Sequence, residues 1–374
     1  MTTTESSAPA YPTDAPHHRH TGRRTFIFLL LLIIVVAAVV KFSGAFASKP
    51  RIALVTASQG PYWDAIIAGA KEAAGRNDAD LDVITPSPAE QERAIRALVG
   101  KGYAGVAVSP NDPVTLAAAL AEVTQDAQLV TFDADCPIAR RLCYIATDNY
   151  DAGHMAGQLV RAAIPDGGEV LIAVGSMDKE NAQRRRQGLI DELLDRPFER
   201  EHVTDAVDAA LKGQKYTIIA TLVDGIDQAK ADMLAAEAIQ KYPNAKCIVG
   251  LFAYNTPVVL KVLERTGKLK QIKVVGFDAY AETLDGIEND SVYGAVLQDP
   301  HFMGFEAVRI LADVAHGNRQ AVPLFQTRSV TCESVTKENL PLMRKTLAAQ
   351  GGGAPLAAPA RAAAEPPATK PAAP

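Results

Sequence analysis

The sequence predicts an α/β protein with two doubly wound lobes, each built on a parallel sheet. From Pro50 onward, short apolar runs of strand length alternate with amphipathic segments of helical length. This alternation is typical of βαβ units, in which helices connect parallel strands and cover both faces of the sheet. The alternation occurs in two successive series, which indicates two lobes.

The first series begins at Arg51 and ends near residue 148. The helix expected over 61–70 depends on Tyr62, Ile66 and Ala70, which recur at helical spacing. Pro110-Asn-Asp-Pro113 ends one element and starts the next. The expected strands and helices are 51–56, 61–70, 81–85, 89–98, 105–109 and 129–133.

The second series begins near Asn149 with a helix around Met155 to Ala163. Apolar runs and amphipathic segments then alternate as before, which predicts a second sheet covered by helices. The expected elements that follow are 169–174, 181–194, 216–221, 227–241, 247–251, 256–266 and 272–276.

Both ends of the chain are expected to stand apart from the lobes. Residues 26–40 are apolar without interruption, follow Arg23-Arg24 and precede Ala45-Phe46-Ala47. This order is typical of a secretory signal, and a membrane anchor retained at residues 26–40 is the alternative. Either case makes 1–48 a separate segment and places the rest in the periplasm or on the outer face of the cytoplasmic membrane. Residues 346–374 are rich in Ala and Pro, so we expect a disordered tail.

Charge and cysteine content exclude several classes of site. The net charge of -5 is small and the central region has no basic stripe, so no nucleic-acid partner is expected. The four cysteines lack C-x-x-C spacing and suitable histidine neighbours, so no metal and no cofactor are expected. A disulfide between Cys136 and Cys143 is expected in an exported chain, with two free thiols as the alternative. Cys247 lies in an apolar run typical of a buried free thiol, and a bridge to Cys332 is the lesser alternative.

Polar and aromatic side chains gather after the predicted strands. In an open parallel sheet, ligands bind at the carboxyl ends of the strands. Carboxylates, amides and an arginine can pair with neighbouring hydroxyls, and aromatic rings offer apolar faces to a sugar ring. This chemistry favours an uncharged polyol. The residues concerned are Gln59, Gly60, Tyr62, Trp63, Ser109, Asn111, Asp112, Asp133, Asp135, Thr147, Asp148, Asn149, Arg185, Tyr254, Asn255, Asp278 and Gln298.

Seven segments in order between Arg51 and Asn339 resemble the ribose-type periplasmic sugar-binding proteins, the substrate-binding components of ABC sugar importers. They are Ile52-Ala-Leu-Val, Pro61-Tyr-Trp, Thr131-Phe-Asp, Ala146-Thr-Asp-Asn with Ala152-Gly, Asn181-Ala-x-x-Arg185-x-x-Gly188, Val274-Val-Gly-Phe-Asp278 and Leu297-Gln298. No single segment is decisive, but their order over that length is specific.

The resemblance implies the type I periplasmic binding fold, with Rossmann-like lobes joined by a three-strand hinge. The first lobe would comprise 49–148 plus 299–326, and the second lobe 149–298 plus 327–345. The chain would cross between the lobes near Asp148, Asp299 and Thr327, which permits hinge closure around a ligand.

The resemblance also implies ligand contacts. The aromatic pair that stacks on the sugar corresponds to Tyr62 and Trp63, the first-lobe carboxylate to Asp133, and the second-lobe arginine to Arg185. The full set of expected ligand-binding residues is Tyr62, Trp63, Ser109, Asp133, Asp135, Arg185, Asn255, Asp278 and Gln298. Asp135 could instead cap a turn or helix. Ribose binders have other residues at Gly60, Ser109 and Ala134, which argues against ribose itself.

We therefore expect a monomeric extracytoplasmic protein that captures a small neutral sugar and delivers it to an ABC permease. A membrane-tethered sensor that presents the ligand to a receptor is the main alternative. An enzyme using Asp133 and Asp135 as an acid–base pair is the second, but the sequence has no nucleophile elbow, phosphate loop or H-E-x-x-H motif. A DNA-binding regulator would need a helix-turn-helix where the apolar segment stands.

Overall fold

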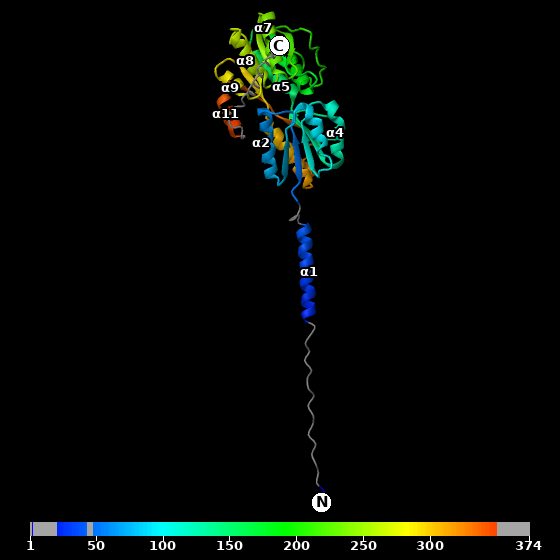
Figure 1. Cartoon of the computed structure of the whole chain (residues 1–374). Coiled ribbons are helices and arrows are strands. Elements are labelled where there is room, and N and C mark those ends of the chain that lie inside the picture. Colours follow the sequence, from blue (N-terminus) through cyan, green and yellow to red (C-terminus); the bar gives the residue numbers. More distant parts are fainter. Residues whose placement is uncertain (1, 3–20, 43–47, 350–374) are drawn as a thin grey trace, which may run out of the picture. The chain divides into compact units, whose positions relative to one another are not determined.

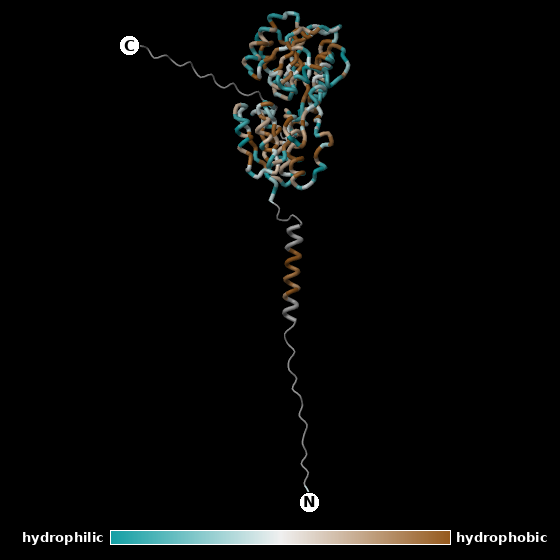
Figure 2. The backbone as a smooth tube through the Cα atoms, turned by 90° about the vertical axis from the view of Figure 1, so that its right-hand side faces the viewer, coloured by the Kyte–Doolittle hydropathy of each residue, from teal (hydrophilic) through white to brown (hydrophobic). Residues whose placement is uncertain are grey.

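The computed structural model describes Thr2, Thr21–Phe42 and residues 48–349, in two compact units that divide at Lys49. The first unit contains α1 (Thr21–Phe42), whose apolar middle is brown in Figure 2. Among the described residues, no helix reaches the length and hydropathy of a membrane span. The expected cleavage motif Ala45-Phe46-Ala47 lies outside the described residues.

The first lobe is built on six strands in the order β12-β5-β4-β3-β1-β2, all paired in parallel. Helices α2 and α10 pack on one face of this sheet, and α3 and α4 on the other. The strands are β1 (Arg51–Val55), β2 (Asp80–Ile84), β3 (Gly105–Val108), β4 (Gln128–Phe132), β5 (Cys143–Thr147) and β12 (Thr327–Val330). The helices are α2 (Pro61–Arg76), η1 (Pro88–Glu90), α3 (Gln91–Arg96), α4 (Pro113–Asp126), α10 (Pro300–Ala315) and η2 (Arg319–Ala321).

The second lobe contains α5, α7, α8 and α9, which Figure 1 labels. It repeats the order of the five strands β5-β4-β3-β1-β2 and has one antiparallel strand at each edge of its sheet. Its sheet runs β13-β11-β10-β9-β6-β8-β7. The strands are β6 (Gly168–Val174), β7 (Leu211–Lys212), β8 (Tyr216–Val223), β9 (Ala245–Gly250), β10 (Lys273–Phe277), β11 (Gly294–Leu297) and β13 (Glu333–Thr336). The helices are α5 (Asn149–Ala163), α6 (Glu180–Leu193), α7 (Gln228–Lys241), α8 (Asn255–Arg265), α9 (Ala281–Glu288) and α11 (Leu340–Ala349). The predicted fold class is confirmed.

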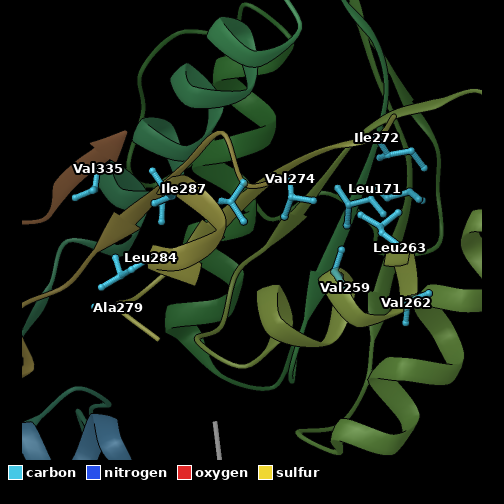
Figure 3. Packing of buried hydrophobic residues seen from close by; sticks show 14 of the residues in the cluster. Leu171, Val259, Val262, Leu263, Ile272, Val274, Ala279, Leu284, Ile287 and Val335 are labelled. Atoms are coloured by element: carbon cyan, nitrogen blue, oxygen red, sulfur yellow. The ribbon is translucent and has the colours of Figure 1, made fainter. Parts of the chain in front are cut away.

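Apolar side chains on both faces of each sheet form the cores. Figure 3 shows one face of the second sheet, where Leu171 and Val274 lie near Val259 and Leu263 of α8. Because helices cover both faces, the central strands are apolar at nearly every position, as buried parallel strands are.

The third crossing between the lobes lies later than the sequence predicts. Thr327–Val330 pairs in parallel with β5 and so belongs to the first lobe, whereas Glu333–Thr336 pairs with β11 of the second lobe. The chain therefore crosses at residues 331–332 rather than near Thr327. Helix α11 continues to Ala349, beyond the predicted start of the tail. The rest of that tail, residues 350–374, lies outside the described residues.

The predicted disulfide between Cys136 and Cys143 is not formed, and all four cysteines are free. Cys143 packs with α2 and α10, whereas Cys136 packs with α3 and α4 on the opposite face of the sheet. The Cys136 thiol instead contacts the Pro113 carbonyl oxygen at 3.3 Å. The sheet therefore separates two cysteines that are close in sequence.

We predict that these thiols react slowly in the folded chain. Burial raises the pKa of Cys143 and of Cys247 to about 12, which suppresses the reactive thiolate. Ellman's reagent at about pH 8 should therefore label the native chain slowly and detect four thiols once it is unfolded without reductant. Detection of only two thiols in the unfolded chain would contradict this prediction and support the Cys136–Cys143 disulfide.

Each lobe contains a helix pair that crosses at two glycines. In the first lobe, a Cβ at Gly69 of α2 would lie 1.9 Å from the His301 oxygen, and one at Gly304 of α10 would lie 2.0 Å from the Ile66 oxygen. In the second lobe, a Cβ at Gly153 of α5 would lie 2.0 Å from the Arg185 oxygen. Only glycine allows the two backbones to approach so closely.

The crossing of α5 and α6 fixes where Arg185 stands. Gly188 follows Arg185 by one helical turn, and a Cβ at Gly188 would lie 2.1 Å from the Tyr150 carbonyl oxygen of α5. Any larger residue at Gly153 or Gly188 would therefore push α6, and Arg185 with it, away from α5.

We predict that Gly188→Ala destabilises the chain by about 1–3 kcal/mol, since the added methyl group overpacks the crossing. Urea unfolding measures this change, and ligand affinity should fall as well. Gly75→Ala in α2 is the matched control, because a Cβ at Gly75 meets nothing within 4 Å. That control should stabilise the chain by about 0.5–1 kcal/mol. Equal effects of the two substitutions would contradict the packing argument.

Candidate functional site

Two aspartates occupy the same place in the two lobes. Asp133 follows β4 and Asp278 follows β10, and each has a positive φ of 61°. The Asp133 N–H donates to the Ile145 oxygen on β5, and the Asp278 N–H donates to the Val296 oxygen on β11, both at 2.9 Å. Aspartate adopts this left-handed backbone conformation more readily than most residues do. The conformation is nevertheless unusual for any residue other than glycine, and it occurs often at functional sites.

On the first lobe, hydroxyl groups surround Asp133. The Tyr62 hydroxyl donates to Asp133 Oδ1 at 2.8 Å, and the Ser109 hydroxyl donates to Oδ2 at 3.2 Å. The Tyr144 hydroxyl donates to the Asp133 carbonyl oxygen at 2.9 Å. Trp63 contacts the Tyr62 ring edge-on, with ring centroids 5.3 Å apart. The structure thus brings four of the predicted residues together on this lobe.

On the second lobe, the buried Arg185 organises the site. Its guanidinium donates to Asn149 Oδ1 at 2.8 Å, to the Leu251 oxygen at 3.1 Å and to Gln298 Oε1 at 2.7 Å. The Gln298 amide in turn donates to both oxygens of Asp278, at 3.0 and 3.2 Å. Arg185 is only 3% exposed, so these acceptors satisfy a charge that would otherwise be costly to bury.

The guanidinium of Arg185 also lies over aromatic rings. Its Cζ atom is 4.9 Å from the Phe277 ring centroid and 5.8 Å from that of Phe252. These cation–π contacts add to the hydrogen bonds.

The two halves lie within electrostatic range of each other. Burial is the main cause that raises the pKa of Asp278, and the negative charge of Asp133 raises it further against the opposing effect of Arg185. Burial likewise raises the pKa of Tyr62, which feels the charges of Asp133, Asp278 and Arg185 together. We define the candidate interlobe site as the following residues, whose side chains come from both lobes: Tyr62, Trp63, Ser109, Asp133, Arg185, Asp278 and Gln298.

Asp135 does not belong to this group, contrary to prediction. Arg141 binds it in two places, through Nε to Oδ1 and through Nη2 to Oδ2, both at 2.6 Å. The Thr131 hydroxyl and the Cys136 N–H also donate to Oδ1, at 2.6 and 2.8 Å. Asp135 therefore holds the loop after β4. It is also unsuited to act with Asp133 as the acid–base pair of an enzyme.

Asn255 lies in a separate buried cluster. Its amide donates to Asp224 Oδ2 at 3.0 Å, and its oxygen accepts from the Phe252 N–H at 2.9 Å. The Tyr254 hydroxyl also donates to Asp224. Burial raises the pKa of Asp224 against these hydrogen bonds. Asn255 thus orders the turns after β8 and β9, next to the Phe252 ring that lies under Arg185.

Two residues that hydrogen-bond to members of the site were not identified by sequence reasoning. Tyr144 lies on β5, and nothing in its local pattern marks its hydroxyl as a partner of Asp133. Asn149 was named only among the polar residues that follow the predicted strands, whereas in the structure Asp148 is the N-cap of α5 and Asn149 binds Arg185. The polar run 147–149 was the only signal for Asn149.

Two lobes that share the order of five strands and are joined by three crossings have the architecture of a two-lobed binding protein. A family model described as periplasmic binding protein domain matches residues 52–319. The chain belongs to this family. As a member of a family of binding proteins, it is not an enzyme, which confirms the prediction.

Curated relatives cover most of the chain. It is 23% identical over 296 residues to the D-allose-binding periplasmic protein of Escherichia coli, covering 75% of this chain and 89% of the relative. It is 21% identical over 232 residues to the ribose import binding protein RbsB of Bacillus subtilis, covering 62% of this chain and 69% of that protein.

A solved structure shares the fold. A solute-binding protein from Burkholderia graminis in complex with D-arabinose has a TM-score of 0.69 and 25% identity, and the match covers 78% of this chain and 97% of that one.

We predict that Asp278→Asn stabilises the ligand-free chain at neutral pH. The pKa of Asp278 is raised in the folded state, so the wild-type chain loses stability relative to the variant as pH rises through that pKa. At a pH below the ordinary pKa of aspartate, Asp278 is protonated in both the folded and the unfolded state. The pH-dependent difference in stability between the wild type and the variant then vanishes. Urea unfolding at about pH 3 and about pH 8 checks this.

Asp290→Asn provides a control of opposite sign. A hydrogen bond from Lys337 lowers the pKa of the exposed Asp290, so this variant should lose stability at neutral pH and approach the wild type as pH falls. Asparagine tolerates the positive φ at both positions. A stability difference for Asp278→Asn that does not depend on pH would contradict the assignment.

Proposed function

We propose that the chain captures a small neutral sugar or polyol between its lobes in the periplasm, or on the outer face of the cytoplasmic membrane, and delivers it to an ABC-type permease. The main support is the interlobe site, where a carboxylate from each lobe stands with Arg185, Gln298 and two aromatic rings. Carboxylates accept from sugar hydroxyls, and amide and guanidinium groups donate to them. The names of the relatives, which bind allose, ribose or arabinose, agree with this class of ligand.

Hinge closure would couple binding to recognition by the permease. Asn149 follows the first crossing and Gln298 precedes the second, and Arg185 binds both of them. A ligand that reaches Asp133 on one lobe and Asp278 on the other would stabilise the closed form, because only that form offers both carboxylates at once.

The first-lobe side of the site argues against ribose as the ligand. A Cβ at Gly60 would meet nothing within 4 Å, so the backbone leaves open space there. The Ser109 hydroxyl already donates a hydrogen bond to Asp133, and Ala134 has no polar side chain. Fewer donors thus face the ligand on this lobe than in ribose binders. We propose a ligand held there mainly by Asp133, Tyr62 and Trp63.

A thermal-shift screen of pentoses, hexoses and cyclitols tests the ligand class. A true ligand at a hundred times its dissociation constant should stabilise the chain by about 2.7 kcal/mol. The absence of any response across the panel would contradict sugar capture. For the delivery step, a permease and an ATPase encoded beside this chain support import, whereas a histidine kinase in their place would contradict it.

We predict that Asp133→Ala and Arg185→Ala each abolish binding of the sugar found in the screen. Truncating one partner of a charged hydrogen bond that the bound ligand buries costs about 2–5 kcal/mol, or at least about thirtyfold in affinity. Isothermal titration calorimetry measures the loss, and circular dichroism checks that the variants fold.

Arg184→Ala is the matched control, since Arg184 stands beside Arg185 but bonds to the Arg200 oxygen and Glu201 on the surface. Its affinity should match the wild type. Unchanged affinity in Asp133→Ala or Arg185→Ala would overturn the site.

A further inference from the structure

The second lobe contains a buried carboxylate that does not belong to the interlobe site. Asp224 follows β8 and is 2% exposed. Its Oδ1 accepts from the Ile226 N–H at 2.8 Å and from the Tyr254 hydroxyl, and its Oδ2 accepts from Asn255 Nδ2 at 3.0 Å. Burial still raises the pKa of Asp224, which means that folding disfavours its charged form. The charge of Asp224 therefore adds no stability at neutral pH.

Asn255 connects this carboxylate to the peptide unit between Leu251 and Phe252. The Asn255 amide donates to Asp224, and its Oδ1 accepts from the Phe252 N–H at 2.9 Å. The carbonyl of the same peptide unit, that of Leu251, accepts from Arg185 Nη1 at 3.1 Å. Because a trans peptide unit is planar, its N–H and C=O point in opposite directions. The direction in which Asn255 holds the N–H therefore also sets how the carbonyl faces Arg185.

The orientation of the Asn255 amide depends on Asp224. The two ends of the amide differ, since the NH₂ group only donates and the oxygen only accepts. Asn255 is 1% exposed, so without Asp224 its NH₂ group would be left buried without a partner. The side chain would then turn toward another acceptor and release the Phe252 N–H.

The backbone around Asp224 is held in an unusual conformation. Ile226, whose N–H donates to Asp224, has a positive φ of 66°, which a β-branched residue rarely adopts. A Cβ at Gly175 would lie 3.0 Å from the Phe252 ring and 3.1 Å from Ile226 Cγ1, so the turns after β6, β8 and β9 meet here. Backbone strain persists where the surrounding structure fixes it, and it occurs often at functional sites.

We propose that Asp224 is a positioning residue for ligand binding. Through Asn255 it orients the peptide unit between Leu251 and Phe252, and this peptide unit holds the guanidinium of Arg185 in place. Both Asp224 oxygens accept from the protein, so Asp224 acts without touching the ligand. Asp224 has this role only if the chain captures a sugar, so the inference rests on the proposed function.

Isothermal titration calorimetry of the full chain with the sugar found in the screen tests this role. Asp224→Ala and Asn255→Ala should each lower the affinity about tenfold, because each breaks the path to Arg185. The binding stoichiometry should stay that of the wild type. A role in folding alone would lower the stoichiometry instead, since fewer molecules would be able to bind. Circular dichroism checks folding, and if Asp224→Ala does not fold, Asn255→Ala must still show the loss of affinity.

Asp224→Asn should recover most of the affinity that Asp224→Ala loses, since asparagine keeps an oxygen that can accept from the Asn255 amide. Tyr254→Phe is the matched control. It removes one donor to the same carboxylate but leaves the hydrogen bond between Asp224 and Asn255, so its affinity should match the wild type. The double variant Asp224→Ala/Asn255→Ala should lose no more affinity than Asp224→Ala, because both substitutions break one path.

Unchanged affinity in Asp224→Ala would overturn the inference and leave the proposed function standing. An equal loss in Tyr254→Phe, or additive losses in the double variant, would have the same meaning. A loss in Asn255→Ala with none in folded Asp224→Ala would also overturn the inference, by assigning Asn255 to direct contact with the ligand. The absence of sugar binding by the wild type would instead overturn the proposed function, and the role of Asp224 with it.

Discussion

The arrangement of the interlobe site depends on one buried guanidinium. A guanidinium buried as deeply as that of Arg185 requires hydrogen-bond acceptors around it. Those acceptors are Asn149 after the first crossing, the Leu251 oxygen at the end of β9, and Gln298 before the second crossing. Each of them is therefore fixed relative to the others. Because Gln298 also binds Asp278, the same guanidinium helps to fix where the second-lobe carboxylate stands, and its charge opposes the rise that burial causes in the pKa of Asp278.

The helix crossing beneath Arg185 makes this arrangement possible. Gly153 and Gly188 let α5 and α6 approach until the backbone of each touches the other. Asn149, at the start of α5, can then reach Arg185 on α6. The first lobe has an equivalent crossing at Gly69 and Gly304, so close packing of these helices is a property of both halves of the fold. The glycines thus serve the site indirectly, through backbone distance rather than through chemistry.

Local sequence patterns predicted the features of the fold that depend on neighbouring residues. They failed for the features that depend on residues far apart in the sequence. Strand and helix positions followed from apolar runs, and the family resemblance of the segment from Asn181 to Gly188 pointed to Arg185 among three adjacent arginines. The partner of Asp135 could not be predicted, because Arg141 reaches it only after the loop has folded back. The assignment of β12 depends on Tyr144, which is far away in the sequence. Cys136 and Cys143 were misjudged because proximity along the chain does not show that a sheet separates them.

The two aspartates show how the two lobes differ. Glycine would adopt the left-handed conformation at both positions without strain, so local structure alone does not favour aspartate there. Retaining a carboxylate at each strand end is understandable if both face a common ligand. Asp133 is surrounded by the hydroxyls of Tyr62 and Ser109, whose hydrogens can rotate and whose oxygens can also accept. Asp278 is held by an amide that Arg185 orients. The second lobe therefore offers the pre-organised half of the site, and the first lobe offers the half that adapts.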